Sequence, residues 1–279
     1  MAPWVPSWGA LDASACMEQW EVNVGSKRHG ELRSRLGGVP VTLPPVSELS
    51  RSTRQLALSI GDDTRPPVPH VVLPGVIHIP NWLGIEEQRR LGQEFRAWAL
   101  PPAGLRHPRV PTGHLMTVQS VCLGWHWFPY VYSRTADDTD GAPVKPLPDS
   151  LIRRARDALA DSYGATSTEA IAYAPDAAIV NLYPDDAQLG LHQDGEEPSD
   201  APVVTISLGD SCTFRMADVD RRVGPFTDID MRSGDLLVFG RENRRIFHGV
   251  PKVFPDTAPD GLDLPRGRLS ITVRETGFD

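Results

Sequence analysis

Hydrophobic and polar positions alternate most regularly in the C-terminal part of the chain. There, short runs rich in β-branched residues are separated by turn-forming Pro, Gly and Asp, which is the pattern of an all-β segment. We expect strands over 71–73 and 76–79 and, after residue 170, over 178–183, 203–208, 212–216, 236–239, 245–248 and 268–273. Short strands of this kind predict a mainly β sandwich or barrel with flanking helices.

Two segments show helical spacing instead. Apolar residues recur at i, i+4 and i+7 in a helix predicted over about 84–99, with acidic residues in its first turn. A second helix is expected over about 150–163, where Asp149 or Ser150 would act as the N-cap. Both helices have one apolar face, so we expect them to pack against the predicted sheet.

The N-terminal part of the chain shows no regular pattern. Its short apolar pieces are interrupted by Gly and Pro, and it ends in the proline-rich stretch Arg65-Pro66-Pro67-Val68-Pro69. We therefore expect residues 1–68 to be an extension that is partly disordered or of unknown role. Residues 69–279 would form the folded domain.

The formal net charge of −8 argues against a surface that is basic over its whole area and grips nucleic acid nonspecifically. A nucleic-acid substrate would have to be held by local clusters, although each such cluster is more typical of a solvated face. The candidates are Arg106/Arg109, Arg153/Arg154/Arg156, Arg221/Arg222 and Arg241/Arg244/Arg245.

Cysteine usage and the apolar runs indicate where the protein resides. Cys16, Cys122 and Cys212 are odd in number and widely spaced, so we expect no disulfide framework and a reducing compartment. The first twenty residues contain no Lys or Arg and no continuous apolar stretch, so a secretory signal is not expected. The sequence also contains no stretch of eighteen consecutive apolar residues. The sequence predicts a cytoplasmic monomer without a membrane span.

A candidate metal site begins with the pair His192 and Asp194. On an extended backbone, positions i and i+2 project to the same face, so both side chains can reach one ion. His248, 56 residues further on, is expected to supply a third ligand from another strand. Two imidazoles and one carboxylate form the facial triad of non-heme iron(II). A zinc hydrolase site and a surface histidine near an aspartate are the alternatives.

A row of polar side chains near the C-terminus points to an anionic ligand. Arg268, Ser270, Thr272 and Arg274 share one face of a predicted strand, because alternate residues point the same way. Burying two cations is costly unless an anion compensates them, and a guanidinium matches a carboxylate in a two-bond fork. A dicarboxylate would satisfy both arginines. The alternative is that they pair with protein acids or lie on a wet face.

Taken in order, these pieces resemble the AlkB family of 2-oxoglutarate- and iron(II)-dependent dioxygenases. The resemblance covers roughly residues 70–279. Its pieces are Asn181-x-Tyr183, His192-x-Asp194 with Glu196-Glu197-Pro198, Pro202 to Gly209, Ser233 to Gly240, Phe247-His248-Gly249 and Arg268-x-Ser270-x-Thr272-x-Arg274. Upstream, Pro111 to His114, Leu123-Gly124-Trp125 and Tyr130 to Ser133 look like the family's substrate lid.

The resemblance implies a double-stranded β-helix (jelly-roll) barrel with iron at its mouth. Arg268 would pair with the distal carboxylate of 2-oxoglutarate, while Arg274, Asn181 and Tyr183 would hold its other end. Ser270 stands where the family often has Asn and is expected to contact the cosubstrate. Phe239 stands where the family often has Trp, and neither departure is expected to abolish the site.

For the substrate, the resemblance implies that Trp125 stacks on the base and that Tyr130 lies near the phosphate backbone. Glu196 sits where the family has an acidic group near the base. The implied reaction, a form of DNA dealkylation repair, couples decarboxylation of 2-oxoglutarate by O2 to hydroxylation of an N-methyl group on a base of alkylated DNA. The products are succinate, CO2, formaldehyde and the repaired base. Basic lid residues of the family appear here as Gln188 and Gly195.

Two other functions remain open from the sequence. One is a dioxygenase of the same fold that acts on RNA, protein or a small molecule, which the negative charge favours. The other is a non-catalytic β-barrel binding module. The presence of all three candidate metal ligands and both arginines argues against the second.

Overall fold

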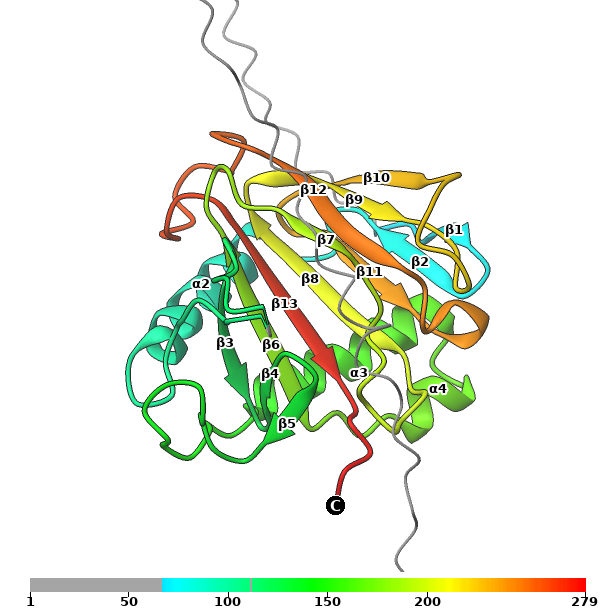
Figure 1. Ribbon diagram of the computed structural model, residues 1–279. Helices are drawn as coiled ribbons and strands as arrows, with labels where there is room; N and C mark the ends of the chain where they lie inside the picture. The colour runs from blue at the N-terminus through cyan, green and yellow to red at the C-terminus, as the bar shows by residue number, and fades with distance from the viewer. Residues whose placement is uncertain (1–66, 111) are drawn as a thin grey trace, which may run out of the picture. The chain divides into compact units, whose positions relative to one another are not determined.

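Two antiparallel β-sheets pack against each other in the computed structural model, which describes residues 67–110 and 112–279 (Figure 1). The extension predicted for 1–68 lies outside the described residues, apart from its last two positions. The larger sheet has the order β1 (His70–Leu73), β2 (Val76–Ile79), β11 (Leu236–Phe239), β8 (Val203–Gly209), β13 (Arg268–Arg274), β6 (Ala177–Tyr183) and β3 (Gln119–Leu123). The smaller sheet has the order β10 (Thr227–Met231), β9 (Ser211–Met216), β12 (His248–Phe254) and β7 (Leu189–His192). This is the predicted jelly-roll architecture.

Helices cover the outer face of the larger sheet. α2 (Ile85–Ala99) and α3 (Asp149–Tyr163) place their apolar sides in one buried cluster with Leu269, Ile271 and Val273 of β13. Each such aliphatic side chain contributes about 1.5–3 kcal/mol when it is fully buried. A short helix, α4 (Thr168–Ala172), follows α3. The inner face of the larger sheet is thereby left for the functional site.

A second apolar cluster lies between the two sheets. It joins Tyr183 and Phe239 of the larger sheet to Phe214, Met216 and Val250 of the smaller one. A hairpin of β4 (His126–Phe128) and β5 (Val131–Ser133) lies outside both sheets and follows β3 in the chain. This hairpin falls within the segment predicted to be the substrate lid.

Two local predictions were wrong. The N-cap of α3 is Pro148, without a side-chain cap, because its fixed φ is already suitable for a helix start. The segment predicted as a strand over 245–248 is a turn, and β12 begins only at His248. The carbonyl of Arg245 is taken by the side-chain amide of Gln193 at 2.6 Å, which removes it from strand pairing.

Strands β3, β4, β5, β7 and β10 were not predicted. They are short or carry polar residues on both faces, as in the sequence Thr-Asp-Ile-Asp-Met of β10. Cys122 and Cys212 are free and buried, whereas Cys16 lies outside the described residues. Within 67–110 and 112–279, no helix is long and apolar enough to cross a membrane.

Candidate active site

A cavity of about 90 Å³ opens between the two sheets. One water needs about 10–15 Å³ on this measure, so the cavity can hold a small organic acid. Its wall includes the inner row of β13, namely Arg268, Ser270, Thr272 and Arg274, as the alternation of that strand predicted. Residues of β6 and β7, the start of β12 and the β4–β5 hairpin also contribute to the wall.

His192, Asp194 and His248 converge on one side of this cavity. One ligand atom from each lies within 4.8 Å of the others. Strand pairing causes this convergence, because His192 at the end of β7 stands opposite His248 at the start of β12. Asp194 follows two residues later on the same chain segment. Two imidazoles and one carboxylate on one side of an open cavity suit non-heme iron(II).

Both imidazoles are oriented by backbone carbonyls. Nδ1 of His192 lies 3.0 Å from the carbonyl of Gly190, and Nδ1 of His248 lies 3.0 Å from the carbonyl of Ile246. A carbonyl can only accept, so each Nδ1 carries the proton and each Nε2 carries the lone pair that a metal ion could use. Burial, together with the charge of His192, lowers the pKa of His248 to about 4. His248 is therefore neutral near pH 7, as a metal ligand must be.

Asp194 is held in its ionised form. Burial raises its pKa, but the charges of Arg274 and of the two histidines outweigh burial and bring the pKa well below its usual range. Nη2 of Arg274 lies 3.1 Å from Oδ2 of Asp194. The carboxylate is consequently ready to bind a cation over the whole neutral range.

Arg274 pairs with protein acids, which is the alternative that the sequence left open. Besides Asp194, it contacts the carboxylate of Glu197 and the phenol of Tyr132, the latter at 3.3 Å. Tyr132 in turn donates to Glu197 at 2.5 Å. Two of the four residues in this cluster, Glu197 and Tyr132, were quoted in the sequence motifs without a role. The need to neutralise a buried arginine next to an acid-rich loop is the signal that could have identified them.

Arg268 behaves differently from Arg274. Its side chain is fully buried, and its Nε donates to the hydroxyl of Ser207 at 3.0 Å. Nη1 and Nη2 have no hydrogen-bond partner among the described residues. The neighbouring groups, the ring of Tyr183 at 5.0 Å and the thiol of Cys212, carry no negative charge at neutral pH, since burial raises the pKa of both. A buried cation that faces a cavity with two unused donors suits a carboxylate ligand.

Register places the remaining predicted cosubstrate residues along this row. Asn181 stands opposite Ser270, and Tyr183 stands opposite Arg268. Tyr183 thus lies at the Arg268 end of the cavity and not at the Arg274 end, where the resemblance had placed it. The amide oxygen of Asn181 accepts a hydrogen bond from Ser120 at 2.5 Å, which fixes the direction of that amide.

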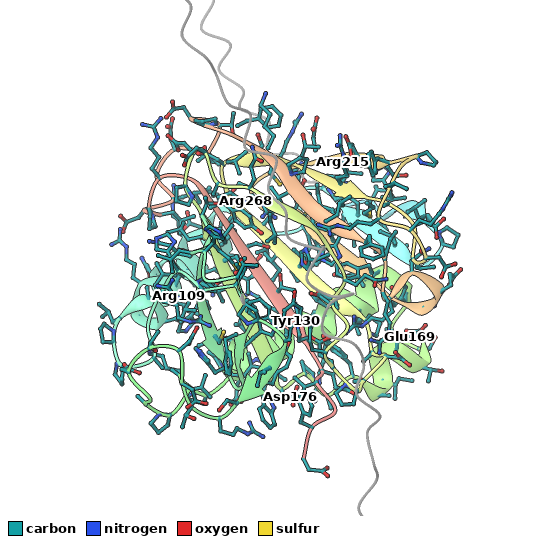
Figure 2. The ribbon with its side chains drawn as sticks, viewed as in Figure 1. Arg109, Tyr130, Glu169, Asp176, Arg215 and Arg268 are labelled. Atoms are coloured by element: carbon teal, nitrogen blue, oxygen red, sulfur yellow. The ribbon has the colours of Figure 1, made fainter. Side chains whose placement is uncertain are left out.

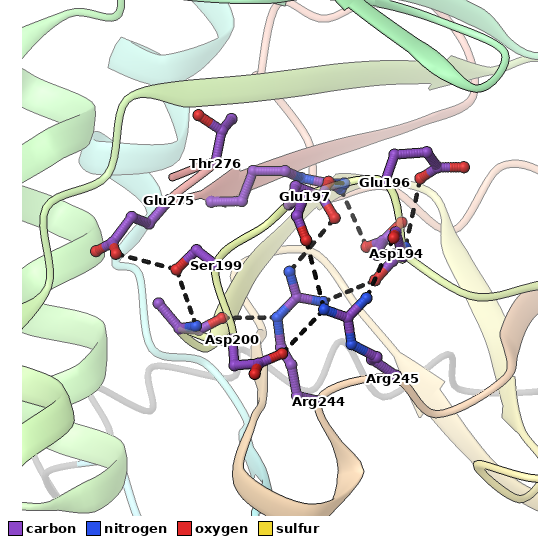
Figure 3. Close-up of polar contacts among 12 residues, drawn as sticks. Asp194, Glu196, Glu197, Ser199, Asp200, Arg244, Arg245, Glu275 and Thr276 are labelled. Atoms are coloured by element: carbon purple, nitrogen blue, oxygen red, sulfur yellow. Dashed lines mark hydrogen bonds and ion pairs between the residues drawn. The ribbon is translucent and has the colours of Figure 1, made fainter. Parts of the chain in front are cut away.

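The loop after Asp194 is tied down by two arginines (Figure 3). Arg244 donates to the carbonyl of Asp194 at 3.0 Å and contacts Glu197 at 3.5 Å, while Arg245 pairs with Asp200 at 2.9 Å. Arg244 is buried, so it is not available as the surface cation that its cluster suggested. These contacts hold the candidate metal ligand Asp194 in place through its own backbone carbonyl and the loop that follows it.

The β4–β5 turn and the loop after Asp194 form the outer wall of the cavity. Trp127 of β4 and Tyr130 of the turn line it together with Glu196. Tyr130, labelled in Figure 2, has a φ of 71° and is 37% exposed. A left-handed conformation is strained for a tyrosine and is typical of functional sites. Burial and the charges of Asp194 and Glu197 raise the pKa of Glu196.

Trp125 is not placed as the resemblance implied. Its Nε1 donates to Asp176 at 2.9 Å, the guanidinium of Arg134 lies 3.5 Å from its ring centre, and Phe278 packs against it. The indole N–H and the ring of Trp125 are therefore both in contact with other protein side chains. The tight turn at Gly124, with a φ of 79°, directs the tryptophan away from the cavity. Trp127, two residues further on, lines the cavity instead and was missed from the sequence.

Comparison with known proteins agrees with this site. The model of the 2OG-Fe(II) oxygenase superfamily matches residues 75–274. The chain belongs to this superfamily and, within it, to the AlkB family. The cofactor of these oxygenases is iron(II), and their cosubstrates are 2-oxoglutarate and O2, as predicted.

Individual relatives include plant and bacterial proteins. The chain is 34% identical over 221 residues to the Arabidopsis thaliana "DNA N(6)-methyladenine demethylase ALKBH1D", covering 73% of this chain and 50% of the relative. It is 33% identical over 212 residues to an "Alpha-ketoglutarate-dependent dioxygenase AlkB homolog" of Caulobacter vibrioides, covering 74% and 90%. The solved structure of OsALKBH1 superposes with a TM-score of 0.63 at 30% identity, covering 75% of this chain and all of that one. The chain thus spans half the length of this Arabidopsis relative.

Proposed function

We propose that the protein is an iron(II)- and 2-oxoglutarate-dependent dioxygenase that removes methyl groups from base nitrogens of nucleic acid. The observation that carries this proposal is the pair of unpartnered donors on the buried Arg268, in the same cavity as His192, Asp194 and His248. A cation with unused donors, a small-molecule cavity and an iron-type donor set are all required by this chemistry. A binding module would need none of them.

Each group of residues has a distinct task in the proposed reaction. His192, Asp194 and His248 would hold iron(II), and Arg268 with Tyr183 would fix the distal carboxylate of 2-oxoglutarate. Iron and 2-oxoglutarate supply the oxidising chemistry, and one oxygen atom of O2 reaches succinate while the other reaches the methyl carbon. The hydroxymethyl group then leaves the base nitrogen as formaldehyde.

The substrate base must be brought to this cavity. A base in a duplex is extruded to reach such a site, at a lower free-energy cost where pairing is already weakened. Trp127 would stack on the base, Tyr130 would lie near its backbone, and Glu196 would accept a hydrogen bond from an exocyclic amine. A base whose exocyclic amine carries or adjoins the methyl group would supply this hydrogen bond, and the Arabidopsis relative is named for N6-methyladenine in DNA, in which the amine carries it.

The direct test is product formation with purified protein, iron(II) and 2-oxoglutarate. We expect succinate and formaldehyde in equal amounts with N-methylated oligonucleotides, and little of either with unmethylated ones. A panel of single-stranded DNA, duplex DNA and RNA assigns the preferred substrate. Absence of succinate under all conditions would contradict the dioxygenase proposal. Succinate without formaldehyde from any oligonucleotide would contradict only the substrate and would favour a protein or small-molecule substrate.

A second prediction separates the two tryptophans of the lid. Stacking of a base on an aromatic ring contributes about 1–3 kcal/mol, so Trp127→Ala should lower kcat/KM for the oligonucleotide by about 5–150-fold. The KM for 2-oxoglutarate should stay within about twofold of the wild-type value. Trp125→Ala should instead destabilise the fold by about 3–5 kcal/mol, measured by denaturant unfolding, because that ring is 8% exposed and packed on protein. The opposite outcome for the two variants would restore Trp125 as the stacking residue.

A further inference from the structure

A polar cluster with three buried members and one partly exposed carboxylate lies behind the lid and takes no part in the proposed chemistry. It consists of Arg106, Cys122, His126 and Asp138, and we call it the lid anchor. Arg106 is 9% exposed, so it cannot act as the surface cation that the sequence suggested. Arg109, three residues on, is the exposed member of that pair, and it bonds the carbonyl of Gly113. Burying a charge of this kind is costly, so the arrangement of its partners is informative.

Arg106 joins three separate chain segments. Its Nε donates to Asp138 at 2.9 Å, in the loop after β5. Its Nη1 donates to the backbone carbonyl of Ser120 in β3 at 3.1 Å, and its Nη2 donates to the backbone carbonyl of Trp127 in β4. The planar guanidinium can satisfy all three acceptors together because its donors form a rigid fork.

The other members of the cluster strengthen these links. Nε2 of His126 lies 2.5 Å from Oδ1 of Asp138. The sulfur of Cys122 accepts a hydrogen bond from the backbone N–H of Trp127 at 3.4 Å and lies 3.8 Å from Nη1 of Arg106. Burial raises the pKa of Asp138, but the bonds from His126 and Arg106 outweigh it and lower that pKa, so Asp138 stays ionised. The backbone of Trp127 is therefore held on both its N–H and its carbonyl side.

Two of the segments that Arg106 holds form walls of the cavity. Trp127 lines it on the lid side, and Ser120 lines it on the β3 side, where its hydroxyl bonds Asn181. Arg106 is therefore the side chain that bonds the backbones of both walls at this point. The β4–β5 hairpin consists of two strands of three residues each. A two-stranded ribbon of this length is only marginally stable alone.

We propose that Arg106, through the lid anchor, is a positioning residue that sets the place of Trp127 and thereby the fit of the substrate base. This inference rests on the proposed function. Arg106 does not line the cavity, so it would act on the base only through Trp127 and Ser120. The residues proposed to hold iron and the distal carboxylate of 2-oxoglutarate (His192, Asp194, His248 and Arg268) are not among the contacts of Arg106, so binding of both should depend little on it.

The test is Arg106→Lys, because lysine keeps the charge that Asp138 needs but cannot bond three acceptors in a plane. We expect kcat/KM for the methylated oligonucleotide to fall by about 10–100-fold, the scale of a misplacement of about 1 Å. The KM for 2-oxoglutarate and the slow succinate release without oligonucleotide should stay within about twofold of wild type. The control is Arg215→Lys, which makes the same change in an exposed fork to Asp228, with bonds of 2.8 and 2.7 Å, and should leave all constants unchanged.

Asp138→Asn provides the second variant if Arg106→Lys does not fold. It should also lower kcat/KM for the oligonucleotide and leave the KM for 2-oxoglutarate near the wild-type value, because Arg106 then loses its ionic partner. Equal kcat/KM for the oligonucleotide in variant and wild type would overturn the inference. An equal rise in the KM for the oligonucleotide and the KM for 2-oxoglutarate would also overturn it, because it would indicate a general loss of structure. If the wild type itself forms succinate but acts on no oligonucleotide, the proposed substrate is wrong and this inference falls with it, whereas an active wild type with an equally active Arg106→Lys overturns the inference alone. The two failures are therefore distinguishable.

Discussion

Substitution of Asp194 by alanine is expected to lower the affinity for iron(II) by at least about 100-fold, since even residues that only orient a metal ligand contribute 10–100-fold. Asp194 is the one anionic group among the three converging side chains, and its carboxylate oxygens lie 3.8 and 3.9 Å from the two histidine Nε2 atoms. Without it, the histidines present two neutral donors, and Arg274 lies beside the ion with one of its two carboxylate partners removed. Metal analysis after anaerobic loading and desalting gives the stoichiometry directly.

Glu196→Ala is the matched control for this experiment. It removes a carboxylate two residues away, in the same loop and cavity wall, that does not belong to the converging cluster. We expect it to retain iron at the wild-type level while its activity on oligonucleotides falls. The fold should survive Asp194→Ala, because Arg274 keeps its ion pair with Glu197. Retention of iron by Asp194→Ala, with normal circular dichroism, would show that the ligand set is wrong.

Much of the barrel was predictable because its core strands are long enough to show a pattern. β6, β8 and β13 have seven residues each and carry continuous or alternating apolar runs, and their register follows from that alternation. β7 and the β4–β5 hairpin were not predictable in the same way. They are short and half-exposed, and tertiary contacts fix them instead of local propensity.

The candidate site was predictable where spacing alone determines direction. His192 and Asp194 at i and i+2, and the inner row of β13, follow from strand geometry. Trp125 was placed wrongly because a turn at a glycine with positive φ breaks the alternation, and nothing in the local sequence fixes the direction of the chain after it. Spacing alone could not identify the partners of Arg274, because the carboxylate of Glu197 and the phenol of Tyr132 approach it from segments 77 and 142 residues away.

Replacing Arg268 by methionine is expected to weaken 2-oxoglutarate binding by about 100-fold or more. Two charge-assisted hydrogen bonds contribute about 1.5–3 kcal/mol each, and about 1.4 kcal/mol corresponds to a factor of ten. Methionine is close in length to the aliphatic part of arginine and carries no charge. The KM for 2-oxoglutarate, measured from succinate release, should rise by this factor, while iron stoichiometry should remain unchanged.

Thermal unfolding without cosubstrate distinguishes a ligand-binding arginine from a structural one. Nη1 and Nη2 of Arg268 have no partner among the described residues, so Arg268→Met removes an uncompensated buried charge and should leave the Tm unchanged or raise it. Arg244→Met is the control. That arginine is also buried but is bonded to Ala201, Asp194 and Glu197, and its loss should destabilise the protein by about 3–5 kcal/mol.

The ligand dependence of the Tm then tests which end of the cosubstrate Arg268 binds. With iron present, 2-oxoglutarate should stabilise the wild type far more than 2-oxobutyrate, which has the same keto-acid end but no distal carboxylate. Arg268→Met should lose this discrimination, because the group that recognises the second carboxylate is absent. A variant that still preferred 2-oxoglutarate over 2-oxobutyrate by the wild-type margin would place the distal carboxylate elsewhere in the cavity. Arg268 would then need another anion to account for its burial.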